Sequence, residues 1–176
     1  YSFSNKLPID KSPAVSQADK LPTNIKARRI ALLTADGVND SAFTEIKKQL
    51  CDMDAIVNII APKHGFVTTK SGDLYPVCES LLTASSVVFD AVYVAGGDSI
   101  ATLSSNANAL HFVAEAFKHC KPIGADADAA ELLIKAIPQV ELPTAGVVTD
   151  GNLDDFVIAL QKHRFWEREE EPKVPA

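Results

Sequence analysis

Short apolar runs alternate with segments of helical periodicity along most of this chain. Five runs have the length and composition of buried strands, and a turn or the start of a helix follows each one. They cover residues 29–34, 55–60, 91–95, 122–125 and 146–148. Because these runs are almost continuously apolar, rather than alternating with polar positions, they predict parallel strands covered on both faces of a sheet.

Four intervening segments repeat apolar side chains at helical spacing. In the first, Phe43, Ile46 and Leu50 recur on one face, and Asp40 or Ser41 can cap the start of the helix. The other three cover residues 108–119, 129–136 and 153–163. Strands alternating with amphipathic helices predict an α/β domain with a flavodoxin-like, doubly wound parallel sheet of about five strands.

The remaining segments define the domain organisation. Residues 66–77 predict a hairpin whose turn contains Gly72. Residues 1–24 are polar, contain three prolines and show no apolar periodicity, which indicates an extended arm or linker that connects to something upstream. We therefore expect one folded domain over residues 25–166 and an acidic C-terminal tail over residues 167–176.

Composition and charge exclude several classes of function. The 176 residues are 47% hydrophobic and 23% charged, which is ordinary for a globular domain. The net charge of −6 argues against a nucleic-acid or membrane partner, and no apolar run approaches the ~20 residues that span a bilayer. Three widely spaced cysteines without a C-x-x-C pair argue against a disulfide scaffold and against a zinc site. We expect the four scattered histidines to be structural or solvated rather than metal ligands.

The first candidate for chemistry is Gly96-Gly97, directly after the third predicted parallel strand. In open α/β sheets, function concentrates in the loops at the carboxyl ends of the strands. Two consecutive glycines let backbone N–H groups face an anion or a developing oxyanion. The alternative interpretation is a tight turn that needs a positive φ. No dinucleotide fingerprint and no P-loop motif accompanies the pair.

The second candidate is residues 123–133, where a strand ends and a helix begins within a few residues, as in a nucleophile elbow. In this order, the two motifs resemble those of the class I glutamine amidotransferase-like and PfpI superfamily. Aligning the helix places Asp126 where that superfamily has its elbow cysteine, and a carboxylate is a poor substitute for a thiolate. The supporting glutamate of many relatives has no match in residues 37–43, where Asp40 is the nearest acid. The resemblance thus implies a degenerate elbow at Asp126 and a vestigial oxyanion-type turn at Gly96-Gly97.

Asp126 and Asp128 also admit explanations that involve no catalysis. Two acids at positions i and i+2 of a strand-to-helix turn are expected to point in different directions, so a shared proton is not expected. No histidine neighbours them in the sequence to complete a metal site. We therefore expect one of the two carboxylates to serve as a helix N-cap.

A closer resemblance covers residues 27–166. Four segments occur in the same order as in the C-terminal domain of large-subunit (clade 2) catalases: residues 29–37, 61–65, 90–97 and 121–125. The closing helix, with its His163-Arg164-Phe165-Trp166 ending, also fits. This resemblance implies a haem-dependent, tetrameric parent enzyme that disproportionates hydrogen peroxide, with the haem held upstream of this segment. It also implies that the partners are the rest of the catalase subunit and its tetramer, in the parent's compartment, cytoplasmic or secreted.

Catalases hold haem iron through an Arg-x-x-x-Tyr helix, and no tyrosine of this chain follows an arginine by four residues. We therefore expect no haem, no metal and no catalysis in this segment. The leading hypothesis is an accessory domain that stabilises the catalase tetramer. A second hypothesis is holdase chaperone activity towards unfolded client proteins. A third is residual hydrolase or glyoxalase activity that uses Cys120, Cys51 or Cys78 as the nucleophile.

Overall fold

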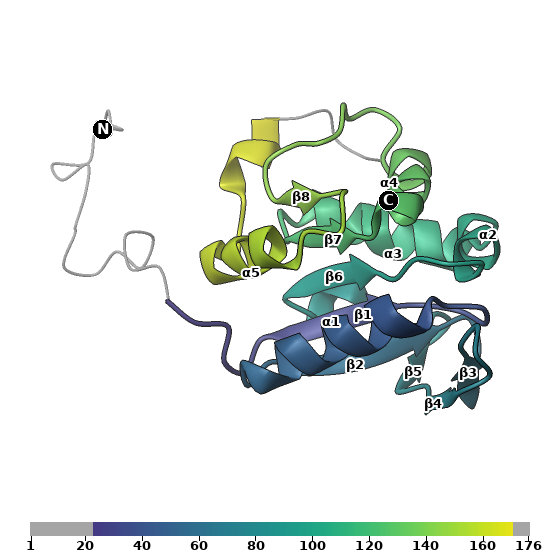
Figure 1. The fold of residues 1–176 in the computed structure, drawn as a ribbon. Coiled ribbons are helices and arrows are strands. Elements are labelled where there is room, and N and C mark those ends of the chain that lie inside the picture. The colour runs from purple at the N-terminus through teal and green to yellow at the C-terminus, as the bar shows by residue number, and fades with distance from the viewer. Residues whose placement is uncertain (1–22, 171–176) are drawn as a thin grey trace, which may run out of the picture.

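The computed structural model of the protein describes residues 23–170. Within them, six parallel strands form one sheet in the order β5-β2-β1-β6-β7-β8 (Figure 1). These strands are β1 (Arg29–Leu33), β2 (Ile56–Ala61), β5 (Glu79–Ser80), β6 (Ala91–Val94), β7 (Ile123–Ala125) and β8 (Val147–Val148). Most of the predicted arm, residues 1–22, lies outside the described residues, as do residues 171–176 of the predicted tail.

Helices cover both faces of the sheet (Figure 1). On one face, α1 (Asp40–Asp52) and α5 (Leu153–Lys162) bury side chains such as Phe43 and Phe156 in a shared core. On the other face, α2 (Ser99–Ser104), α3 (Ala107–Lys118) and α4 (Ala130–Ala136) bury side chains such as Phe112 and Leu133 in a second core. The doubly wound, flavodoxin-like sheet predicted from the sequence is confirmed.

The strand order reverses once, between β1 and β6. After β2, the chain forms the antiparallel hairpin of β3 (Phe66–Thr68) and β4 (Leu74–Pro76) and then the edge strand β5. It next returns to the free side of β1 and adds β6, β7 and β8 in sequence. The predicted hairpin is confirmed, and the reversal places the loop after β1 beside the loop after β6 at the carboxyl edge of the sheet.

The first helix starts differently from the prediction. Asn39 occupies the N-cap position of α1 and makes no side-chain capping bond. The Asp40 carboxylate instead accepts hydrogen bonds from the backbone N–H and the hydroxyl of Ser71 in the hairpin turn. The Ser71 hydroxyl bond, together with one from Thr69, lowers the pKa of Asp40. The Asp40 carboxylate therefore binds the hairpin turn instead of capping the start of α1.

The packed part of the chain extends past the predicted boundary at Trp166. Three short 3-10 helices complete the structure: η1 (Ser86–Val88), η2 (Ala127–Ala129) and η3 (Trp166–Glu170). Within η3, Arg168 is only 4% exposed, and its guanidinium lies over the ring of Phe117 at 4.6 Å from the ring centroid. It also donates a hydrogen bond to the carbonyl of Lys121. An arginine inside an acidic run thus anchors the first turn of the predicted tail to the domain.

Candidate functional site

The two loops that the sequence singled out meet at the carboxyl edge of the sheet. Gly96 and Gly97 follow β6, and Asp126 follows the neighbouring strand β7. The Gly96 N–H donates to Asp126 Oδ2 at 2.8 Å, and the Gly97 N–H donates to Asp128 Oδ2, also at 2.8 Å. The consecutive amides that could face an external anion therefore face two carboxylates of the chain itself.

Tyr93, a residue of β6, also belongs to this hydrogen-bond network. Its hydroxyl donates to Asp126 Oδ1 at 2.7 Å, so that both oxygens of that carboxylate accept a hydrogen bond. The tyrosine is fully buried, and its ring packs edge-on against Phe156 with the ring centroids 5.1 Å apart. Burial, followed by the bond to Asp126, raises the pKa of Tyr93 far above its usual value, so the hydroxyl remains a donor. Sequence reasoning did not select Tyr93 as part of the site.

The loop after β1 also forms backbone hydrogen bonds with the glycine turn. The Asn39 N–H donates to the Gly96 carbonyl at 3.1 Å, and the Asp98 N–H donates to the Gly37 carbonyl at 3.0 Å. Gly97 has φ +104°, and a Cβ there would lie 2.7 Å from both the Asn39 nitrogen and the Gly37 oxygen. A Cβ on Gly96 would lie 2.0 Å from Asp128 Oδ1. A side chain at Gly97 would therefore meet backbone, whereas one at Gly96 would have to displace the exposed Asp128 carboxylate.

The expected roles of the two acids need correction. Asp126 does stand at the N-cap position of η2, but its side chain makes no capping hydrogen bond. The two carboxylates were expected to point in different directions, yet both reach the same glycine turn. The physical reason is that the glycine turn presents two consecutive backbone N–H groups, and each of them donates to one of the two carboxylates.

The backbone at Asp126 is relaxed. Its φ of −61° and ψ of 154° are ordinary extended values, unlike the strained turn that projects the nucleophile of an elbow. The side chain is held at both oxygens, by Tyr93 and by Gly96. Chemically, the arrangement is a hydrogen-bonded clamp that ties the end of β6 to the start of η2.

The three cysteines lie elsewhere. Cys120 precedes β7 at the amino edge of the sheet, opposite the glycine turn, and is 2% exposed. Burial raises the pKa of its thiol, which disfavours the nucleophilic thiolate. Cys51 and Cys78 are exposed, on α1 and beside β5 respectively. The geometry at the glycine turn thus offers no thiol for the hydrolase hypothesis among the described residues.

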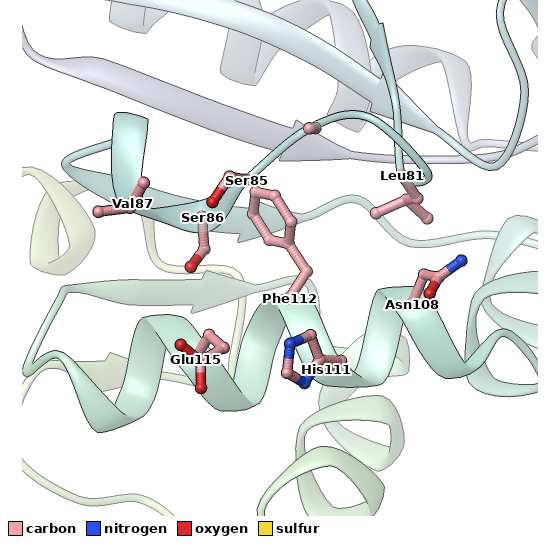
Figure 2. A pocket seen from close by; sticks show the side chains of 9 residues that line it. Leu81, Ser85, Ser86, Val87, Asn108, His111, Phe112 and Glu115 are labelled. Atoms are coloured by element: carbon pink, nitrogen blue, oxygen red, sulfur yellow. The ribbon is translucent and has the colours of Figure 1, made fainter. Parts of the chain in front are cut away.

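A cavity of about 170 Å³ with both polar and apolar walls lies between η1 and α3 (Figure 2). His111 and Glu115 come from consecutive turns of α3, and Ser86 faces them from η1. The Glu115 carboxylate lies near two residues at the end of α3. Its Oε1 is 3.6 Å from Lys118 Nζ, and its Oε2 is 3.4 Å from His119 Nε2. These pairings indicate a helix-end charge network.

Neither a metal cluster nor a membrane span occurs in the part of the chain that the structure describes. Across residues 23–170, no group of three or more histidine, cysteine, aspartate or glutamate side chains is arranged to hold a metal ion. In the same residues, no helix is both long enough and apolar enough to cross a bilayer.

Residues 26–170 match the family described as the C-terminal domain found in long catalases. The chain belongs to this family. This confirms the resemblance that the ordered sequence segments indicated.

Several curated catalases are similar to this catalase C-terminal domain. Catalase HPII of Mycobacterium avium is 39% identical over 94% of this chain and 26% of the relative. Catalase-1 of Neurospora crassa is 33% identical over 90% of this chain and 26% of the relative. Catalase-2 of Bacillus subtilis is 33% identical over 89% of this chain and 23% of the relative. The chain spans about a quarter of the length of these curated relatives.

Solved structures give the same fold. The ThiJ/PfpI domain protein from Brachyspira murdochii has a TM-score of 0.66 at 15% identity, over 77% of this chain and 95% of that one. A two-domain protein from Anabaena variabilis, with ThiJ/PfpI-like and ferritin-like domains, has a TM-score of 0.59 at 23% identity. That match covers 62% of this chain and 33% of the other. At these identities the likeness shows the architecture alone, and it confirms the predicted PfpI-type fold.

Proposed function

We propose that this catalase C-terminal domain is an accessory part of a haem catalase subunit, stabilises the tetramer and performs no catalysis of its own. The match to the C-terminal domain found in long catalases supports the accessory place, and one structural observation supports the absence of catalysis. Asp126 and Asp128 accept the hydrogen bonds of the Gly96 and Gly97 N–H groups. The positions that correspond to the nucleophile and the oxyanion donors of the superfamily therefore form a clamp here. Such a clamp stabilises the carboxyl edge of the sheet without presenting a reactive group.

The haem and the disproportionation of hydrogen peroxide belong, in this proposal, to the rest of the catalase subunit. The tyrosines among residues 23–170 do not fit a haem ligand. Tyr93 is buried with its hydroxyl bonded to Asp126, and the ring of Tyr75 packs against Phe43 at a centroid distance of 4.9 Å. Neither follows an arginine by four residues. We derive no step of peroxide chemistry from this domain.

Deleting the domain from the full-length catalase tests the proposal. We expect the midpoint of thermal inactivation to fall by several degrees, since contacts that slow unfolding of the tetramer are lost. Peroxide turnover per bound haem should stay the same at low temperature. The measurements are residual activity after heating and the haem content of each preparation. An unchanged midpoint would contradict the stabilising role, and loss of turnover with haem intact would contradict the absence of a catalytic role.

A second candidate, holdase activity, is favoured by the outer face of the hairpin. Phe66 pairs with Pro76 and Thr68 pairs with Leu74, so these side chains share one face of the two strands. Phe66 is 64% exposed and Leu74 is 62% exposed, while Val67 on the other face is buried. Exposed apolar side chains gathered on one surface are typical of sites that bind other proteins.

The holdase proposal predicts that excess domain suppresses aggregation of a heat-labile test enzyme, followed by light scattering. The double variant Phe66→Ser/Leu74→Ser should lose most of this effect, because the apolar face would become polar. The matched control is Ile134→Ser/Ile158→Ser, which removes two apolar side chains of similar exposure, 56% and 62%, from α4 and α5. Equal suppression by both double variants, or none by the unmodified domain, would refute a holdase face on the hairpin.

A further inference from the structure

A pocket at the opposite edge of the sheet combines positive charge with exposed apolar side chains. It has a volume of about 240 Å³ and lies where η1, the end of α3 and η3 come together. Its walls include the cations Lys118, Lys121 and Arg164, the carboxylate of Glu169, and the apolar side chains of Val87 and Trp166. Three lysine or arginine residues and one glutamate thus line this pocket, although the net charge of the chain is −6.

The three cations differ in their contacts within the protein. Lys118 is paired with Glu115, whose Oε1 lies 3.6 Å from Lys118 Nζ. Lys121 is 2% exposed, and the hydrogen bond that its ammonium donates within the described residues goes to the Ser86 carbonyl at 2.5 Å. An ammonium has three donors, and this bond uses one of them. Arg164 directs Nη1 to the carbonyls of His163 and Asp90, at 2.9 and 3.4 Å.

Lys121 and Arg164 repel one another. Burial, and after it the charge of Arg164, lowers the pKa of Lys121 to about 8, although Asp90 and Glu115 act in the opposite direction. Burial also lowers the pKa of Arg164. Two partly desolvated cations that share a pocket are destabilising, and an anion placed between them relieves that repulsion.

Two exposed apolar side chains line the pocket. Trp166 is 61% exposed and Val87 is 68% exposed, and both line the cavity. An inorganic anion would use the cations but leave these two surfaces in water, whereas an organic anion would cover them. The volume is below the ~300–1,000 Å³ of pockets for drug-sized ligands, so it suits an acid with a single ring or a short chain.

We propose that this pocket binds a small organic anion, with its carboxylate facing Lys121 and Arg164 and its apolar body packed on Trp166 and Val87. This ligand site is separate from the glycine turn and independent of the accessory role. These contacts predict an order of affinity. A ring that carries a carboxylate should bind best. A neutral ring lacks the contacts with the cations, and an inorganic anion lacks those with Trp166 and Val87.

Titration of the protein with benzoate, benzamide and inorganic phosphate tests this order. Because Trp166 is the single tryptophan of the chain, its indole N–H gives one signal in a ¹H–¹⁵N spectrum and reports on the pocket directly. We expect benzoate to shift that signal saturably. Benzamide and phosphate should bind at least about tenfold more weakly, since a hydrogen bond to a charged group is worth ~1.5–3 kcal/mol and tenfold corresponds to ~1.4 kcal/mol. Equal affinity of benzamide and benzoate, or no saturable shift with benzoate, would overturn the proposal.

Variants separate the two halves of the pocket. Arg164→Gln should weaken benzoate binding by about tenfold or more, because it removes a charged partner of the carboxylate. The matched control is Lys70→Gln, which removes the same charge at the opposite edge of the sheet, where Lys70 pairs with Asp98 at 3.2 Å. If Arg164→Gln does not fold, Trp166→Ala at an exposed position should weaken benzoate and leave phosphate unchanged, as measured by calorimetry. Benzoate affinities equal to that of the unmodified protein in the variants that fold would refute the site.

Discussion

Gly97→Ala should lower the free energy of unfolding by about 3 kcal/mol or more, because backbone strain and a steric clash act together at this position. The φ of +104° is unfavourable for any residue with a side chain. In addition, the new methyl group would lie 2.7 Å from backbone atoms of Asn39 and Gly37, which cannot move without breaking the loop after β1. Urea unfolding followed by circular dichroism measures the loss.

The matched control is Gly72→Ala in the hairpin turn. Gly72 has a similar φ of +97°, but a methyl group added there would meet no atom within 4 Å beyond its chain neighbours. The control should therefore lose only the strain contribution, about 1–2 kcal/mol. If the two variants lose the same free energy, the close packing around Gly97 has no energetic effect, and the clamp is looser than the structure indicates.

Asp126→Ala should cost about 3 kcal/mol, since it removes the acceptor of two hydrogen bonds to a charged group and leaves the donors without it. The Tyr93 hydroxyl is buried and cannot turn to water, and the Gly96 N–H loses its partner as well. The comparison variant is Asp128→Ala. Its bond to Gly97 is exposed, so water can replace the carboxylate and the cost should stay below about 1 kcal/mol.

A double-mutant cycle with Tyr93→Phe isolates the buried bond. We expect the loss for the double variant to be smaller than the sum of the two single losses by about 1 kcal/mol or more, because both single changes break the same contact. Additive losses would show that Tyr93 and Asp126 do not interact, which would contradict the clamp.

The sheet and the long helices could be predicted because their signals are local. The run at Arg29–Leu33 and the helix at Asp40–Asp52 carry their own periodicity, and the structure has both. The edge strand Glu79–Ser80 and the helix Ser99–Ser104 were not predicted. The strand has two residues and no apolar run, and the six-residue helix is too short to show a face. The strand forms because it pairs with β2, and the helix packs against α3 and α4.

The site was predictable as two loops but not as one network. Gly96 and Asp126 are thirty residues apart, and their contact depends on β6 and β7 being neighbours in the sheet. Local capping preference favoured an N-cap role for one of the two acids, whereas both bind amides in the loop after another strand, β6. A signal for Tyr93 did exist. A tyrosine inside an otherwise apolar strand must find a partner for its buried hydroxyl, and the nearest polar side chain after the adjacent strand is Asp126.

The clamp also sets how the glycine turn responds to solutes. Asp126 and Asp128 are tethered 2.8 Å from the amides, so they act as internal ligands with a very high effective concentration, on the order of molar or above for well-oriented groups. A free anion at millimolar concentration competes with them at a disadvantage of roughly a thousandfold or more on that scale. The turn is therefore saturated by its own chain, and phosphate or carboxylate in solution should leave it unchanged.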